Sequence, residues 1–158
     1  MTIRLQPRIA QPFRAQDYIL HEALQNAVEV AIALGQPLLL TGEPGTGKTK
    51  LAQRVALDLS KANGSDFLNK PLVFNTKTTS AARDLFYTYD ALSHFQASNI
   101  KQQEGTKSLR TADFIELQAL GKAIALTNPA AVDASKFCTP LPANPQSSVV
   151  LVDEIDKA

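Results

Sequence analysis

Hydrophobic residues along this chain occur in two patterns, which are continuous runs and helical repeats. Residues 37–41 and 149–152 are apolar runs, and residues 71–76 begin with a similar run. Short runs of this kind are typical of strands that are buried on both faces of a parallel sheet. We therefore predict three parallel strands at these positions.

Helical repeats separate the three runs. Residues 48–62 carry leucine or valine at every fourth position from Leu51, which predicts a helix. An earlier helix is predicted to start at Asp17, a suitable N-cap, and to end at Gly35. Two further helices are predicted from the capping residues Ser80, in a segment that runs through Phe95, and Asp113. Strands that alternate with helices predict an α/β fold with a parallel sheet.

The segment between the first run and the following helix has the pattern G-x-x-x-x-G-K-S/T of a phosphate-binding loop. Its residues are Gly42, Glu43, Pro44, Gly45, Thr46, Gly47, Lys48 and Thr49. The glycines let the backbone approach a phosphate closely, and the successive N–H groups form an anion-binding nest. Lys48 is expected to reach the β- and γ-phosphates, and the Thr49 hydroxyl to ligate Mg²⁺. A chance match is disfavoured because a predicted strand precedes the loop and a predicted helix follows it.

The apolar run at residues 149–152 ends in two carboxylates, Asp153 and Glu154. This arrangement is typical of a Walker B strand. A carboxylate at the tip of a buried strand can hold Mg²⁺, which is the role we predict for Asp153. The next carboxylate, Glu154, is predicted to activate a water molecule as the catalytic base. Taken alone, the segment is equally compatible with an ordinary strand that ends in solvated acids.

Together the two motifs resemble those of the AAA+ ATPases. GEPGTGKT at residues 42–49 and VVLVDEIDKA at residues 149–158 are close to the sequences that this superfamily carries. The nearest branch is the MoxR-like ATPases, in which an opening helix leads into a loop of the GEPGTGKT type. The resemblance implies a P-loop NTPase fold, which is a three-layer α/β/α sandwich around a parallel sheet. It also implies ATP and Mg²⁺ as cofactors.

The resemblance further implies parts that this sequence does not show. The AAA+ sheet has five parallel strands in the spatial order five-one-four-three-two, and our three runs correspond to strands one, two and three. Strands four and five, the helical lid, the sensor residues and the arginine finger have no counterpart. We therefore expect a fragment that ends just after Walker B, most simply a truncated reading frame or a partial chain. Residues 1–16 are expected to be an extended lead-in, and residues 17–158 a partial AAA+ nucleotide-binding domain.

For function, the resemblance implies Mg²⁺-dependent ATP hydrolysis that drives the remodelling of a partner protein. It also implies a homo-oligomeric ring, expected to be a hexamer, and partners that often carry von Willebrand A-type domains. Two alternatives stay open, namely a nucleotide-binding or partner-binding module without turnover and a non-functional fragment. Because an arginine finger is missing, we expect little ATPase activity from the isolated chain.

Composition narrows the range of partners. The formal net charge is +1 and the chain has one cysteine, so neither nucleic acid nor an internal disulfide is expected. No apolar stretch approaches the roughly 18 residues of a membrane span, and the N-terminus lacks the apolar core of a secretory signal. We therefore expect a cytoplasmic protein without a membrane partner.

Overall fold

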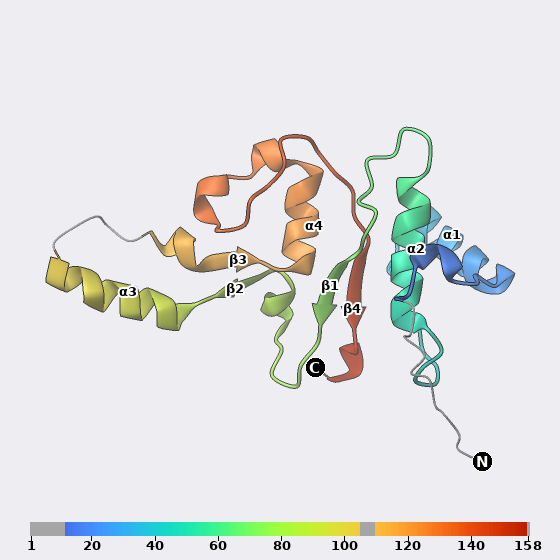
Figure 1. Ribbon diagram of the computed structural model, residues 1–158, viewed down its shortest axis with the longest axis horizontal. Helices are drawn as coiled ribbons and strands as arrows, with labels where there is room; N and C mark the ends of the chain where they lie inside the picture. Colours follow the sequence, from blue (N-terminus) through green and yellow to red (C-terminus); the bar gives the residue numbers. More distant parts are fainter. Residues whose placement is uncertain (1–11, 105–109, 158) are drawn as a thin grey trace, which may run out of the picture.

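The computed structural model describes residues 12–104 and 110–157 and is shown in Figure 1. Its α-helices are α1 (Glu22–Leu34), α2 (Lys48–Ser60), α3 (Ala91–Glu104) and α4 (Ala119–Thr127). Its strands are β1 (Leu72–Asn75), β2 (Tyr87–Tyr89), β3 (Ile115–Leu117) and β4 (Val150–Asp153). Short 3₁₀ helices occupy Ala15–Asp17, Ala82–Leu85, Thr111–Phe114, Pro129–Ala131, Ala134–Lys136 and Ile155–Lys157.

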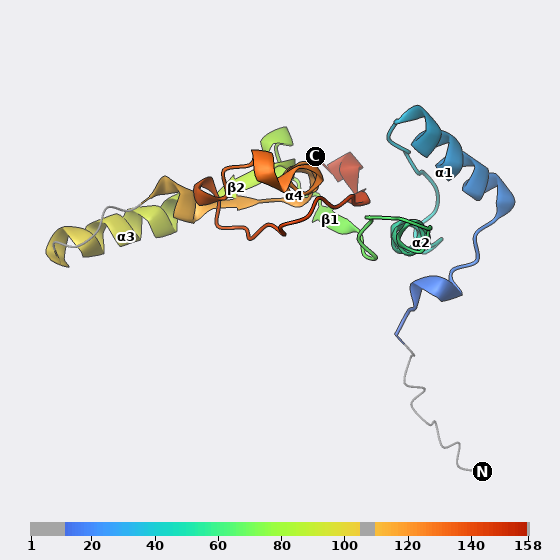
Figure 2. The ribbon, with the colours of Figure 1, turned by 90° about the horizontal axis from the view of Figure 1, so that it is seen from above.

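The strands β1 and β4 form a parallel pair, in which Leu72 lies opposite Val150 and Asn75 lies opposite Asp153. These are the second and third strands of the sequence prediction, and their neighbouring position agrees with the order that it implied. Helix α4 packs on both strands, and α2 lies beside β4 on the side away from β1 (Figure 1). Helix α1 lies farther from the sheet than α2 (Figure 2). The architecture is α/β and compatible with part of a P-loop NTPase fold.

The predicted first strand is wrong in the structure. Residues 37–41 are assigned no strand, and none of the described strands pairs with them. The Leu39 side chain is 73% exposed. Strands are stabilised by pairing with a neighbour, and β4 pairs with β1 and not with this run. An apolar cavity of about 320 Å³ lies between this run, α2 and β4 instead.

Three helix predictions, those that start at Asp17, Ser80 and Asp113, also needed correction. The first helix begins at Glu22 rather than Asp17, with His21 in an extended N-cap conformation, and ends at Gly35 as predicted. The segment from Ser80 to Phe95 is not one helix but a 3₁₀ turn, the strand β2 and the start of α3. The Ser80 hydroxyl accepts a hydrogen bond from the backbone N–H of Lys77 instead of capping a helix.

The reason for the second error is a hairpin-like pairing between distant segments. Strand β2 pairs antiparallel with β3, so that Tyr87 lies opposite Leu117 and Tyr89 lies opposite Ile115. Aromatic and β-branched residues favour such pairing, and it removes both β2 and β3 from the predicted helices. The helix predicted to start at Asp113 therefore begins only after β3, as α4. This second sheet was not predicted.

Candidate functional site

The loop that precedes α2 carries three glycines in unusual backbone conformations. The φ angles are 142° at Gly42, 81° at Gly45 and 87° at Gly47, a region that residues with side chains rarely adopt. Gly47 is the N-cap of α2, and its carbonyl oxygen accepts a hydrogen bond from the Lys50 N–H. The loop thus ends at a helix N-terminus, where free N–H groups and the helix dipole favour an anion.

Lys48 folds back over this loop. Its Nζ donates hydrogen bonds to the carbonyl oxygens of Gly42 at 2.7 Å and of Glu43 at 2.8 Å. The Thr46 hydroxyl donates to the same Glu43 carbonyl at 2.9 Å. All three bonds are exposed to solvent, so the ammonium group lies where it can exchange carbonyl oxygens for those of a bound anion.

Thr49 connects the loop to the end of the parallel sheet. Its Oγ1 donates a hydrogen bond of 2.9 Å to Oδ2 of Asp153, the last residue of β4, across 104 positions of sequence. Pairing with β1 fixes the Asp153 backbone, since its carbonyl oxygen accepts from the Thr76 N–H at 3.1 Å. Two oxygen donors from separate elements therefore converge at this point.

Glu154 directly follows β4 and has φ 56°, which makes it the non-glycine residue with positive φ in the described part of the chain. Backbone strain of this kind is concentrated at functional sites. The Glu154 carboxylate accepts a hydrogen bond from Lys157 Nζ, and this bond is the main reason why the pKa of Lys157 is raised. Both side chains are half exposed, so the ion pair is weakly held and can be exchanged for other partners.

These groups border an open cleft of about 580 Å³. Its lining residues are Gly42, Pro44, Gly45, Gly47, Lys48, Thr49, Lys50, Asp153, Glu154 and Asp156. The structure thus brings eight of the ten residues singled out in the sequence to one cleft, and the other two, Glu43 and Thr46, belong to the same loop but do not line the cleft. Lys50 and Asp156 were missed. The signal for Asp156 was its place two residues after Glu154, in the same acidic cluster.

The oxygen donors of the cleft suit one kind of metal ion. No group of three or more His, Cys, Asp and Glu side chains within residues 12–104 and 110–157 could hold a metal ion. Mg²⁺ bound together with a nucleotide does not require such a group, because one or two carboxylates and the phosphates supply its ligands. The Thr49 hydroxyl and the Asp153 carboxylate are donors of this type. The cleft therefore fits Mg²⁺ that arrives with a phosphate ligand.

None of the helices in the described residues combines the length and the apolar character that crossing a membrane requires.

Comparison with known protein families finds a match over the N-terminal part of the chain. The family model described as "Magnesium chelatase, subunit ChlI" matches residues 16–99, which is more than half of the 158 residues. The matched range contains the phosphate loop and α2, and it ends before Asp153 and Glu154. No curated protein and no solved structure matches the chain. The AAA+ level of the predicted resemblance is confirmed, and the chain belongs to the magnesium chelatase subunit ChlI family of AAA+ ATPases.

Proposed function

We propose that this protein binds ATP together with Mg²⁺ in the cleft between the phosphate loop and the end of β4. The contact between Thr49 and Asp153 carries the proposal, because it joins the two motifs that the chemistry needs. A glycine-rich loop alone can be a simple turn, and acids after a strand can be solvated. Their convergence at a helix N-terminus is what a Mg²⁺–polyphosphate ligand requires.

Each side chain has a distinct part in this proposal. The N–H groups of the loop bind the phosphate oxygens, and Lys48 releases the carbonyl oxygens of Gly42 and Glu43 to bind the β- and γ-phosphates. Thr49 and Asp153, whose mutual hydrogen bond places their oxygen atoms side by side, would hold Mg²⁺, which would neutralise phosphate charge. We assign residues 17–158 to one nucleotide-binding domain, with residues 1–16 as its lead-in.

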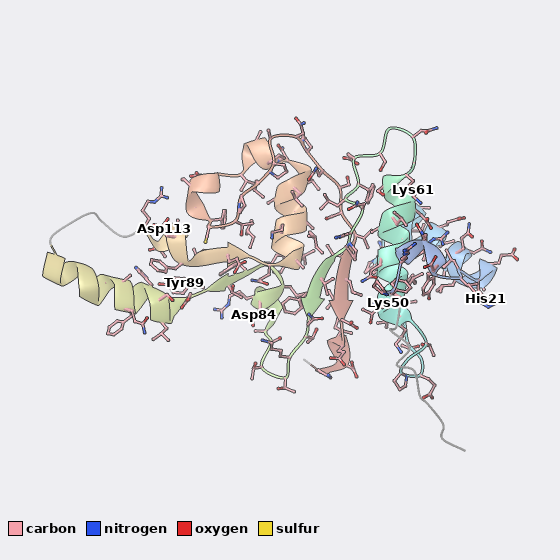
Figure 3. The ribbon with its side chains drawn as sticks, viewed as in Figure 1. His21, Lys50, Lys61, Asp84, Tyr89 and Asp113 are labelled. Atoms are coloured by element: carbon pink, nitrogen blue, oxygen red, sulfur yellow. The ribbon has the colours of Figure 1, made fainter. Side chains whose placement is uncertain are left out.

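Substitution of Lys48 tests the binding proposal. Lys48→Ala removes the ammonium group that faces the phosphates, so affinity for a fluorescent ATP analogue should fall by at least about tenfold. Lys61→Ala is a matched control. Lys48 is the first residue of α2, whereas Lys61 follows its last residue, and Figure 3 shows Lys61 at the end of α2 opposite the cleft residue Lys50. Equal affinity in the Lys48→Ala variant and the wild type would refute the phosphate-loop assignment.

We further propose that Glu154 activates a water molecule for hydrolysis when the protein is assembled. The carboxylate would accept a proton from the water, whose oxygen attacks the γ-phosphorus while the bond from this phosphorus to the β–γ bridging oxygen breaks, so that ADP leaves and inorganic phosphate is released. In this role Glu154 must first release Lys157. Glu154→Gln keeps the shape and removes the base, so ATP binding should persist while turnover falls at least about 100-fold. Lost binding in this variant would move Glu154 to the metal ligands, and retained turnover would exclude it as the base.

A second candidate function is nucleotide binding without turnover by the single chain. No arginine is among the residues that line the cleft, and an arginine that stabilises transition-state charge contributes about 10³–10⁵ in rate. A measurement of Mg²⁺-dependent phosphate release against protein concentration separates the two candidates. Turnover per chain that rises with concentration indicates a catalytic group from a neighbouring copy, whereas turnover that is absent at every concentration supports the binding module.

Membership of the AAA+ ATPases supports a proposal for the assembly and its partner. AAA+ proteins generally oligomerise, and we propose a homo-oligomeric ring, a hexamer, that remodels a partner protein. The family name describes a chelatase subunit, which favours another subunit as the partner. The MoxR-like interpretation favours a protein with a von Willebrand A-type domain instead. Pull-down with each class of partner in the presence of a non-hydrolysable ATP analogue decides between them.

A further inference from the structure

The segment before α1 lies against α2 and the phosphate loop. We call residues 13–18 the arm; its 3₁₀ turn Ala15–Asp17 lies beside α2 in both ribbon views (Figures 1 and 2). The Lys50 ammonium group lies over the Phe13 ring at 4.7 Å from its centre, which is a favourable cation–π distance. The arm therefore contacts the first turn of α2, the same turn that borders the cleft.

Arg54 fastens the arm to α2. Its Nη1 donates to the carbonyl oxygens of Gln16 at 3.1 Å and of Tyr18 at 3.0 Å, and its Nε donates to Asp58 at 2.6 Å. A planar guanidinium group holds several acceptors in fixed directions at once. By binding two carbonyls that are two residues apart, Arg54 fixes the backbone that carries Tyr18. This contact also accounts for an extended chain where a continuous helix was predicted.

The Tyr18 ring covers the last glycine of the phosphate loop. Its Cε2 atom lies 3.2 Å from the place where a Cβ on Gly47 would be, and its hydroxyl oxygen lies 3.8 Å away. Gly47 has φ 87° and begins α2. Because glycine has no Cβ, its backbone can adopt many conformations. An aromatic ring packed on Gly47 restricts the conformations that this residue can reach.

We propose that Arg54 is a positioning residue for the phosphate loop, because it holds the Tyr18 ring against Gly47 and so keeps the loop in its binding conformation. Fixing a glycine-rich loop before the ligand arrives lowers the entropy lost on binding. The proposal rests on the proposed function for the identity of the ligand, which is a polyphosphate with Mg²⁺. In this proposal the Tyr18 ring contacts the phosphate loop, and it does not stack on the base of a bound nucleotide.

Inorganic tripolyphosphate tests this assignment, because it has the phosphates of ATP and no base. Titration calorimetry with Mg²⁺–tripolyphosphate and with Mg²⁺–ATP should show both affinities weakened by a similar factor, about tenfold, in Arg54→Met and in Tyr18→Ala. Arg54→Lys keeps the charge without the fork, so it should lose less. Loss of affinity for ATP alone would place Tyr18 on the base and overturn the proposal.

Two matched controls separate positioning from general destabilisation. Asp58→Asn removes the exposed ion pair of Arg54 and keeps its bonds to both carbonyls, so affinity should stay within about twofold. Tyr18→Phe keeps the ring that contacts Gly47, so it should also bind within about twofold. A loss in Asp58→Asn as large as that in Arg54→Met would make the ion pair the decisive contact, against the proposal.

A measurement without any ligand keeps the proposal testable if the proposed function fails. The N–H groups of Lys50 and Leu51 both donate to the Gly47 carbonyl oxygen, so their exchange reports how firmly Gly47 is held. In the unliganded protein their hydrogen exchange should be at least about threefold faster in Arg54→Met than in the wild type. Exchange in β1 and β4 should be unchanged. If the wild type binds neither tripolyphosphate nor ATP, the proposed function is wrong, and the exchange of Lys50 and Leu51 still decides the role of Arg54. Unchanged exchange at these two residues would overturn that role.

Discussion

The two apolar runs that flank the candidate site have opposite fates in the structure. Strand β4 pairs with β1 and is covered by α4, whose Ala119, Ala125 and Leu126 are buried. Residues 37–41 have no strand partner, and the neighbouring α1 has no buried residue. We call β1, β4 and α4 the sheet side of the molecule, and α1 with residues 37–41 the helix side.

The difference shows that an apolar run becomes a strand only where another strand can pair with it. Burial of apolar area stabilises the sheet side, and backbone hydrogen bonds fix its register. On the helix side the same kind of sequence stays exposed along an apolar cavity. The candidate site lies between the two, so one half of it is fixed by the sheet and the other half depends on α2 and the arm.

Truncation of one leucine on each side should give the largest contrast. Leu126 is 5% exposed and Leu39 is 73% exposed. Leu126→Ala should lower the free energy of unfolding by about 2–5 kcal/mol because it leaves a cavity, whereas Leu39→Ala should change it by no more than about 0.5 kcal/mol. Urea denaturation measures both. Similar losses would mean that residues 37–41 are packed in solution, and the contrast between the sides would disappear.

Two glycines provide the next contrast. A Cβ on Gly121 in α4 would lie 2.0 Å from the backbone oxygen of Phe86, whereas Gly35 after α1 has φ 61° and open space around it. Alanine at Gly121 gains helix propensity of about 1 kcal/mol, but it must move a backbone oxygen, so a net loss of about 1–3 kcal/mol is expected. Gly35→Ala should cost only the left-handed strain, about 1 kcal/mol. A stabilised Gly121→Ala protein would show that α4 does not approach Phe86 so closely.

The smallest expected effect is a dependence of helix content on pH. It arises from Asp90, which lies between the strand β2 and the helix α3. The Ser93 hydroxyl and the Ser93 N–H donate hydrogen bonds to the Asp90 carboxylate and lower its pKa. A pKa that is lower in the folded state gives a stabilisation that is present above the unfolded value, near 3.8, and is lost as pH falls through the folded pKa. Helical circular dichroism should therefore decrease below about pH 4.

Asp90→Asn keeps an acceptor and removes the titration, so its helical signal should depend less on pH in this range. Asp133→Asn is a matched control, since Ser135 lowers the pKa of Asp133 in the same way beside a 3₁₀ turn and not an α-helix. Identical pH profiles for the wild type and Asp90→Asn would show that the Asp90 carboxylate does not support α3.

Prediction from the sequence succeeded where local chemistry decides the structure. The helix α2 followed from leucine and valine spacing, and the end of α1 followed from Gly35, which adopts the left-handed conformation that ends helices. The phosphate loop followed from its glycines, which have the positive φ angles expected of them. The pairing of β1 with β4 followed from the resemblance and not from the runs themselves. The roles of the site residues stay predictions.

The sequence by itself determined the pattern of the phosphate loop and the acidic end of β4, because both depend only on residue types and their spacing, and it predicted the phosphate and Mg²⁺ roles of these residues. Only the tertiary structure decided that residues 37–41 stay unpaired, that β2 pairs with β3, and that Arg54 holds Tyr18 against Gly47. Each of these outcomes depends on a partner far away along the chain. Strand pairing and side-chain contacts over such separations are set by three-dimensional packing, which no local periodicity encodes.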